Sequence, residues 1–263
     1  MTDHAPGSGH TDIARNKLLR TVAIALVLVF PFLKVLYTTG DSEIAGEVVR
    51  LHGPSGWAAV ILDNVLSYPA LFLTLFVLIS GSASVLSTAA TVSRRVLGRS
   101  DEAPAPSAAV TVLLVLTAPV LGSLWALVLF GPLWAIATGS ATLIFRMPSD
   151  AQRVRYALAA RRGSPAPRVH ERLSAVGKAL LHVLALVVLP LVVLYVIFDG
   201  RAWETARLCN VESVGEGTHP AVIIEIERGS NGISTGWRVG TKDIVSGTGC
   251  VEHDDHIRKA LWD

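Results

Sequence analysis

The stretch APAPSAAVTVLLVLTAPVLGSLWALVLFGPLWAIATGSATLIF, residues 103–145, decides the fold of this chain. Its 43 residues include no charged side chain, and it is bounded by Glu102 and Arg146. One helical crossing of a bilayer needs about 20 apolar residues, so the stretch is long enough for two. Phe130-Gly131-Pro132, near its middle, is typical of one helix ending and another beginning. We therefore predict a helical hairpin that crosses a membrane twice, with arms at residues 108–129 and 132–146.

The composition places the whole chain among membrane proteins. Of its 263 residues, 51% are hydrophobic and only 17% are charged, whereas soluble domains carry about 25% charged residues. Three further apolar segments have the length of a membrane span: residues 18–37, 69–91 and 179–198. The predicted fold is thus an all-α transmembrane bundle of five helices within residues 18–198, with the hairpin at its centre. The polar residues 1–17 are predicted to form a disordered cytoplasmic N-terminus.

The distribution of positive charge predicts the orientation. Five spans with a cytoplasmic N-terminus place 14 of the 23 Lys and Arg residues inside: in the N-terminal tail, in the linker Arg94–Arg99 and in the loop Arg146–Lys178. Cytoplasmic loops carry such an excess. A single central crossing would instead put the eight cations of the last loop outside. Residues 199–263 are therefore predicted to be extracytoplasmic.

The environment of the chain follows from the same charges. Arg outnumbers Lys 18 to 5, a bias that indicates a GC-rich bacterial genome and hence a bacterial plasma membrane. The loop Arg146–Lys178 is expected to contact anionic lipid headgroups. Tyr156 is its one aromatic residue suited to stacking on bases, and we therefore expect no nucleic-acid partner.

Residues 199–263 have the pattern of a small, mostly β domain. Ala221–Arg228 alternates apolar and polar residues, as a half-buried strand does. Gly229–Gly232 is predicted to be a turn, and Gly236–Val239 the partner strand of a hairpin. A third strand at Asp243–Ser246 and a short helix at His256–Trp262 complete the prediction.

Two side-chain chemistries stand out in this domain. Cys209 and Cys250 are the only cysteines, and an oxidising compartment predicts that they form a disulfide. His253 and His256 lie among carboxylates, and with His219 they form a candidate zinc site. The alternative is an ordinary solvated surface without a bound metal, and no other cofactor is predicted.

Three polar residues lie near the outer ends of the predicted spans: Lys34, Asp63 and Asn64. We expect Lys34 to extend its ammonium group to the headgroup level. The alternative is that the three residues form an intramembrane polar site, since ionisable groups inside membranes are usually functional. Residues 38–56 are predicted to be an irregular polar loop, and the apolar residues 57–63 either lie on the membrane or begin the second span.

The hairpin arms carry small residues at a spacing of four. They are Ala118, Gly122 and Ala126 in the first arm and Gly131, Ala135 and Gly139 in the second. Such stripes let helix backbones approach closely. We expect the arms to pack on each other or on neighbouring helices, and a homo-oligomer contact is the alternative.

The sequence carries no catalytic or cofactor motif that predicts an enzyme. A folded outer domain beside spans with few ionisable groups favours an interaction, scaffold or sensing role with an envelope protein as partner. A transporter or channel component is the alternative, and a membrane-embedded enzyme ranks third. Polar residues converging inside the bundle would indicate transport, whereas a dry, packed interior would indicate a scaffold.

Overall fold

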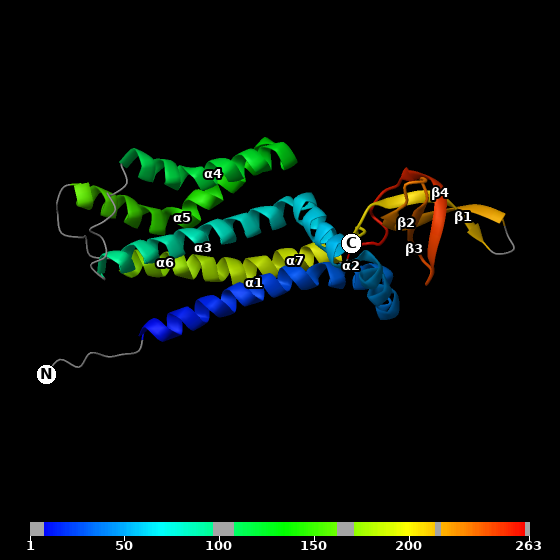
Figure 1. Cartoon of the computed structure of the whole chain (residues 1–263), viewed down its shortest axis with the longest axis horizontal. Coiled ribbons are helices and arrows are strands. Elements are labelled where there is room, and N and C mark those ends of the chain that lie inside the picture. The colour runs from blue at the N-terminus through cyan, green and yellow to red at the C-terminus, as the bar shows by residue number, and fades with distance from the viewer. Residues whose placement is uncertain (1–7, 97–107, 162–170, 214–216, 261–263) are drawn as a thin grey trace. The chain divides into compact units, whose positions relative to one another are not determined.

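The computed structural model (Figure 1) describes residues 8–96, 108–161, 171–213 and 217–260. Their contacts divide the chain into two compact units. The first, here called the helix–barrel unit, comprises Met1–Tyr68 and Leu191–Asp263. The second, the helical unit, comprises Pro69–Pro190. The residues predicted to be an outer domain thus share a compact unit with the N-terminal helices.

The part of the chain before residue 199 is mostly helical. Its helices are α1 (Ser8–Thr39), α2 (Ser42–Ser67), α3 (Pro69–Val96), α4 (Ala108–Phe130), α5 (Pro132–Arg161), α6 (Glu171–Val183) and α7 (Leu189–Phe198), with a π-helical segment, Leu184–Val188, between the last two. All five predicted spans fall within these helices. The hairpin turn is at Gly131, whose φ of 90° is readily adopted by glycine.

The apolar length of the helices supports fewer spans than the five predicted. Within the described residues, Val110–Phe130 and Ala175–Phe198 are long and apolar enough to cross a membrane. A third span results if residues 42–67 and 69–84 count as one broken helix, and Ile24–Thr39 is a shorter apolar helix. Two to three candidate spans suggest membrane association.

Two N-terminal predictions are wrong. Residues 38–56 are not an irregular loop, because α2 begins at Ser42, where the Asp41 side chain caps the helix by accepting a hydrogen bond from the Glu43 N–H. Gly53 and Pro54, which indicated a loop, produce only a local break in α2. At this break Gly53 has a non-helical φ of 61°. The helix α1 begins at Ser8, so residues 8–17, expected to be disordered, are helical.

The C-terminal residues form a closed, antiparallel, four-stranded barrel (Figure 1). Its strands are β1 (Ala206–Ser213), β2 (Gly217–Arg228), β3 (Ser234–Arg238) and β4 (Ile244–Glu252). The predicted hairpin is β2–β3, and the predicted third strand is the start of the longer β4. The sequence reading missed β1, which pairs with both β2 and β4. No helix follows β4 in the described residues up to 260, so the short helix predicted from His256 is wrong there.

The small-residue stripes lie where helices of the helical unit meet. A Cβ atom added to Gly139 of α5 would lie 2.3 Å from Ser123 Oγ of α4, and one added to Gly122 would lie 2.4 Å from the Phe76 ring of α3. The Ser123 hydroxyl donates to the Ala135 carbonyl at 3.0 Å. Gly139 therefore allows α4 and α5 to approach closely, and Gly122 allows α4 to approach α3, as predicted for packing on each other or on neighbouring helices.

Gly139→Leu is expected to destabilise the helical unit by about 1–3 kcal/mol, because the new side chain has to displace Ser123 and part α4 from α5. The matched control is Ser140→Leu, since Ser140 is exposed one position along the same helix. Thermal unfolding of the detergent-solubilised chain measures both. Equal losses in the two variants would contradict the packing role of the stripe.

Candidate functional site

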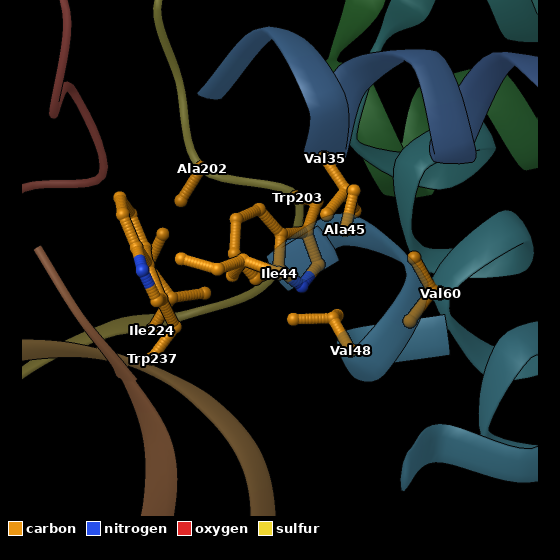
Figure 2. Packing of buried hydrophobic residues seen from close by; sticks show 9 residues of the cluster. All are labelled: Val35, Ile44, Ala45, Val48, Val60, Ala202, Trp203, Ile224 and Trp237. Carbon is orange, nitrogen blue, oxygen red and sulfur yellow. The ribbon is translucent and has the colours of Figure 1, made fainter. Parts of the chain in front are cut away.

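The barrel and the N-terminal helices share one hydrophobic core, here called the junction core. It contains Val35 of α1; Ile44, Ala45, Val48 and Val60 of α2; Ala202 and Trp203 after α7; and Ile224 and Trp237 of the barrel. Figure 2 shows Trp203 among the side chains of α1 and α2. The Trp203 and Trp237 rings lie 5.9 Å apart. A shared core means that the barrel does not fold around its own residues alone.

Beside the junction core lies a buried polar cluster of Lys34, Tyr68 and Asp199. Lys34 Nζ donates to the Tyr68 hydroxyl and lies 3.4 Å from Asp199 Oδ1. The Tyr68 hydroxyl donates to Asp199 Oδ2 at 2.5 Å, and the Arg201 N–H donates to Oδ1 at 3.0 Å. A buried charge is tolerated when it is paired and hydrogen-bonded, and both charges here are. The cluster ties the end of α1, the end of α2 and the residue after α7 to one another.

This cluster corrects the interpretation of Lys34 as an interface anchor. Its side chain is 0% exposed, so the ammonium group does not extend to a headgroup layer. Asn64 is also buried, and it donates to the Val60 and Trp203 carbonyls at 2.8 and 2.9 Å. Asp63 is exposed. The three residues predicted as one polar site therefore do not form a single cluster.

Sequence reasoning missed Tyr68 and Asp199 as the partners of Lys34. Asp199 directly follows a 20-residue uncharged segment, and Lys34 lies near the outer end of the first predicted span. Opposite charges at the same predicted depth are a signal for pairing inside a membrane protein. The sequence thus contained a signal for the Lys34–Asp199 pair. It contained none for Tyr68, whose hydroxyl group is hydrogen-bonded to both.

Acidic side chains gather at another edge of the junction. The pKa of Glu204 is raised to about 7, chiefly by burial and to a smaller extent by the nearby carboxylates of Asp63, Glu225 and Asp255. Glu225 forms an ion pair with Arg207, with 2.6 Å between Oε2 and Nε. Asp255 accepts a hydrogen bond from the Ala206 N–H at 3.0 Å. Within the described residues no cation is paired with Glu204, so its ionisation is costly.

Glu204 is expected to make the chain less stable as pH rises. Its pKa in the folded chain exceeds the ordinary value of 4.5, so the folded state binds the proton more tightly, and stability falls as pH rises from about 4.5 to about 7. In Glu204→Gln, the decrease in the free energy of unfolding between pH 5 and pH 8 should be smaller than in wild type by about 1–2 kcal/mol. This value is already reduced for the partial exposure of the side chain to solvent. Unfolding at pH 5 and pH 8 measures it, with exposed Glu252→Gln as the control. A wild-type slope retained in Glu204→Gln would contradict the assignment.

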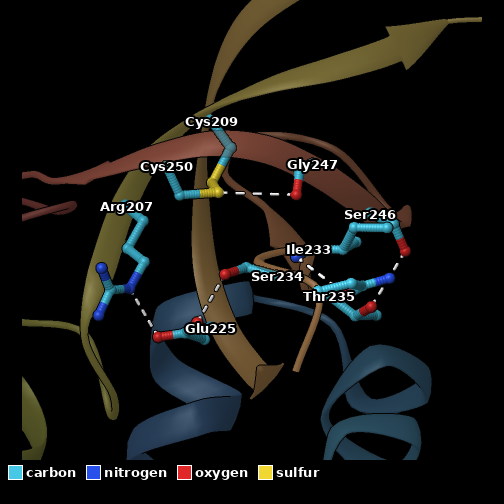
Figure 3. The surroundings of a disulfide bond; sticks show 10 residues. Arg207, Cys209, Glu225, Ile233, Ser234, Thr235, Ser246, Gly247 and Cys250 are labelled. Atoms are coloured by element: carbon cyan, nitrogen blue, oxygen red, sulfur yellow. Dashed lines mark hydrogen bonds and ion pairs between the residues drawn. A yellow bond between two sulfur atoms is a disulfide. The ribbon is translucent and has the colours of Figure 1, made fainter. Parts of the chain in front are cut away.

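The predicted disulfide is present between Cys209 of β1 and Cys250 of β4 (Figure 3). The two Cα atoms are 4.1 Å apart. Cys209 is buried against Val211 and Ile223 in a second small core inside the barrel. Next to it, Glu225 of β2 accepts hydrogen bonds from Arg207 of β1 and Ser234 of β3, each at 2.6 Å. Together these contacts link all four strands.

The histidines proposed as zinc ligands are not brought together. The described residues contain no group of three or more His, Cys, Asp or Glu side chains suited to a metal ion. His219 lies in β2 opposite Val211. The His256 ring instead contacts Asp254 at 3.1 Å and Arg201 at 3.3 Å, and the His253 N–H donates to the Ala206 carbonyl. The structure thus gives the zinc prediction no support.

The helical unit contains its own buried polar cluster, centred on Asp150. Arg146 Nε donates to Asp150 Oδ2 at 3.0 Å, and Arg153 Nη1 lies 3.8 Å from Oδ1. Ser84 of α3 donates to the same carboxylate at 2.8 Å. Arg146 is 7% exposed, so this residue of the basic loop contributes to packing and does not face lipid headgroups. Arg155 is exposed, and most of the remaining cations of the loop lie outside the described side chains.

No protein-family model, curated protein or solved structure matches this chain.

Proposed function

We propose that this chain is a five-span plasma-membrane protein whose extracytoplasmic barrel senses or binds an envelope partner and conveys that state to the membrane helices. The hairpin and the candidate spans support the membrane placement. The positive charge on the predicted inner segments supports the orientation. The disulfide fits an oxidising compartment outside the cytoplasm.

The shared junction core carries this proposal. Here α1, α2 and the barrel bury their apolar side chains together, so the barrel is joined to the helices by packing and not by the chain connection alone. The buried Lys34–Asp199 pair lies beside that core. A change in barrel packing therefore reaches α1 and α2 through side chains in direct contact, as coupling between sites requires.

Site-specific photocrosslinking in cells tests the interaction. A photoreactive residue is placed at Val251 or Glu252, which are exposed on β4, and at Ile136 on α5 as a control. One and the same envelope protein should be captured from both β4 positions and not from Ile136. Capture of lipid alone at β4, or of the same protein at Ile136, would contradict a binding role for the barrel.

Reporter fusions test the topology. A reporter that is active only outside the cytoplasm should be active when fused after Phe198 and silent when fused within residues 153–172. The reason is the energetic preference for cations on the cytoplasmic side. The reverse pattern would exclude the five-span arrangement.

A proton-coupled transporter is the second candidate, and the buried Lys34–Tyr68–Asp199 cluster favours it because paired charges in apolar helices often carry protons. The purified chain in vesicles with a pH-sensitive dye would then show proton flux that Asp199→Asn abolishes. Flux no greater than that of empty vesicles would exclude this candidate.

A further inference from the structure

A hollow opens in the helix–barrel unit beside the junction core, where α1 ends and α2 begins. Its volume is about 430 Å³. Three segments form its walls: the α1–α2 connection, the end of β3 with the turn that follows, and the C-terminal segment around Arg258. Pockets for small ligands have volumes of about 300–1,000 Å³, so the hollow is large enough for a polar group with part of an apolar chain.

Arg258 places a guanidinium group in this hollow in a fixed position. It donates to the Tyr37 carbonyl through Nη1, and its centre lies 5.5 Å from the Tyr37 ring. A Cβ atom added to Gly40, whose φ is 69°, would lie 2.9 Å from Nη2, so glycine makes room for the guanidinium. Within the described residues, Nη2 and Nε have no hydrogen-bond partner. This leaves a planar pair of donors suited to a phosphate or carboxylate group.

Lys242 supplies a second cation from the turn after β3. Its ammonium group lies 2.5 Å from Asp41 Oδ2, and the lysine side chain is 79% exposed. The charged residues of the lining are thus Lys242, Arg258 and Asp41, two cations against one carboxylate. The excess of one positive charge favours an anionic ligand that contacts both cations.

The remaining lining distinguishes a lipid phosphate from a free one. Ile44, Trp237 and Ile257 give the hollow an apolar wall beside its cations. Thr38 and Thr39, also in the lining, end the apolar helix Ile24–Thr39. In a helix that enters a membrane, the residues that end the apolar stretch lie at headgroup level. A lipid there presents an anionic phosphate next to glycerol and acyl carbons.

We propose that this hollow binds the phosphate group of an anionic phospholipid, with Arg258 donating two hydrogen bonds and Lys242 providing a point charge. The glycerol and acyl carbons contact the apolar wall. The site deepens the proposed function, on whose membrane placement it rests, by naming a ligand for the junction between helices and barrel. Bound lipid would stabilise the contact between the α1–α2 connection and the barrel.

Calorimetry on the full chain in a neutral detergent tests the site. The probes are dihexanoyl phosphatidylglycerol, the neutral dihexanoyl phosphatidylcholine and inorganic phosphate. Phosphatidylglycerol should bind tightest, and Arg258→Gln and Lys242→Gln should each weaken its binding about tenfold, because each removes charge-assisted hydrogen bonds. Lys259→Gln is the matched control, since the side chain of this neighbouring cation does not line the hollow, and it should leave the affinity unchanged.

Three outcomes would overturn the proposal: phosphatidylcholine binding as tightly as phosphatidylglycerol, inorganic phosphate binding as tightly as the lipid, or Lys259→Gln weakening binding as much as Lys242→Gln. Arg258 also holds Tyr37, so a folding defect in Arg258→Gln leaves Lys242→Gln as the deciding variant. Binding in detergent does not depend on which side of a membrane the barrel faces. Failure of this site is therefore distinguishable from failure of the topology, which the reporter fusions measure.

Discussion

Lys34→Met is expected to destabilise the helix–barrel unit by about 3–5 kcal/mol, the cost of leaving one charge of a buried ion pair without its partner. Lys34 is 0% exposed and Asp199 is 7% exposed, so water does not solvate the remaining carboxylate well. Tyr68 and the Arg201 N–H still donate to Asp199, which places the expected loss toward the lower end of this range. Thermal unfolding followed by tryptophan fluorescence measures it, because Trp203 and Trp237 lie in the junction core.

A double variant separates the loss of a charge pair from the loss of packing. Lys34→Met combined with Asp199→Asn removes both charges and should recover at least half of the stability lost in Lys34→Met alone, since no unpaired charge stays buried. Lys242→Met serves as the exposed control, because the Lys242–Asp41 pair has similar chemistry at the surface. A shift in Lys34→Met no larger than that in Lys242→Met would contradict a structural role for the buried pair.

Loss of the Cys209–Cys250 disulfide is the second large expected effect. The bond joins residues 41 apart, and in the chain-entropy model closing such a loop contributes about 4 kcal/mol. Cys209→Ala with Cys250→Ala should lower the free energy of unfolding by about this amount, with some added cost because Cys209 is buried in the barrel. Denaturant unfolding of the full chain measures the change.

Reduction provides an independent control for the disulfide. Wild-type chain treated with a reductant should unfold at a denaturant concentration close to that of the double alanine variant, and the reductant should not affect the variant. Maleimide labelling of natively expressed protein should require reductant first. Labelling of both thiols without reductant would show that the bond is absent and would also question the extracytoplasmic placement.

The sequence predicted correctly those elements that a pattern within one short segment determines. The hairpin follows from 43 uncharged residues broken by Gly131-Pro132, and the β2–β3 hairpin follows from the alternation in Ala221–Arg228. The disulfide followed from cysteine count and expected compartment. The helix α2 was missed because Gly53 and Pro54 read as a loop, although only one residue there leaves the helical conformation.

The candidate site could not be predicted in the same way because its contacts join distant residues. Lys34 and Asp199 are 165 positions apart, and Asn64 and Trp203 are 139 apart. No periodicity connects such pairs, and a lysine near the end of an apolar helix usually extends to the headgroups. The strand β1 was missed for a related reason: its inward residues Cys209 and Val211 gain their burial from β2 and β4, while Asn210 between them is exposed.

The division of the chain into its two units has a consequence for biogenesis. The helix–barrel unit joins the first 68 residues with the last 73, whereas the helical unit is one continuous segment, Pro69–Pro190. During synthesis α1 and α2 emerge first, yet Asp199, which pairs with Lys34, and Ile224 and Trp237, which complete the junction core, are made much later. All residues of the helical unit are therefore synthesised before the barrel strands that pack against α2 are present. A chain cut short before β1 would lack Ile224 and Trp237, so the apolar side chains of α2 and Trp203 would lose the barrel side of their shared core.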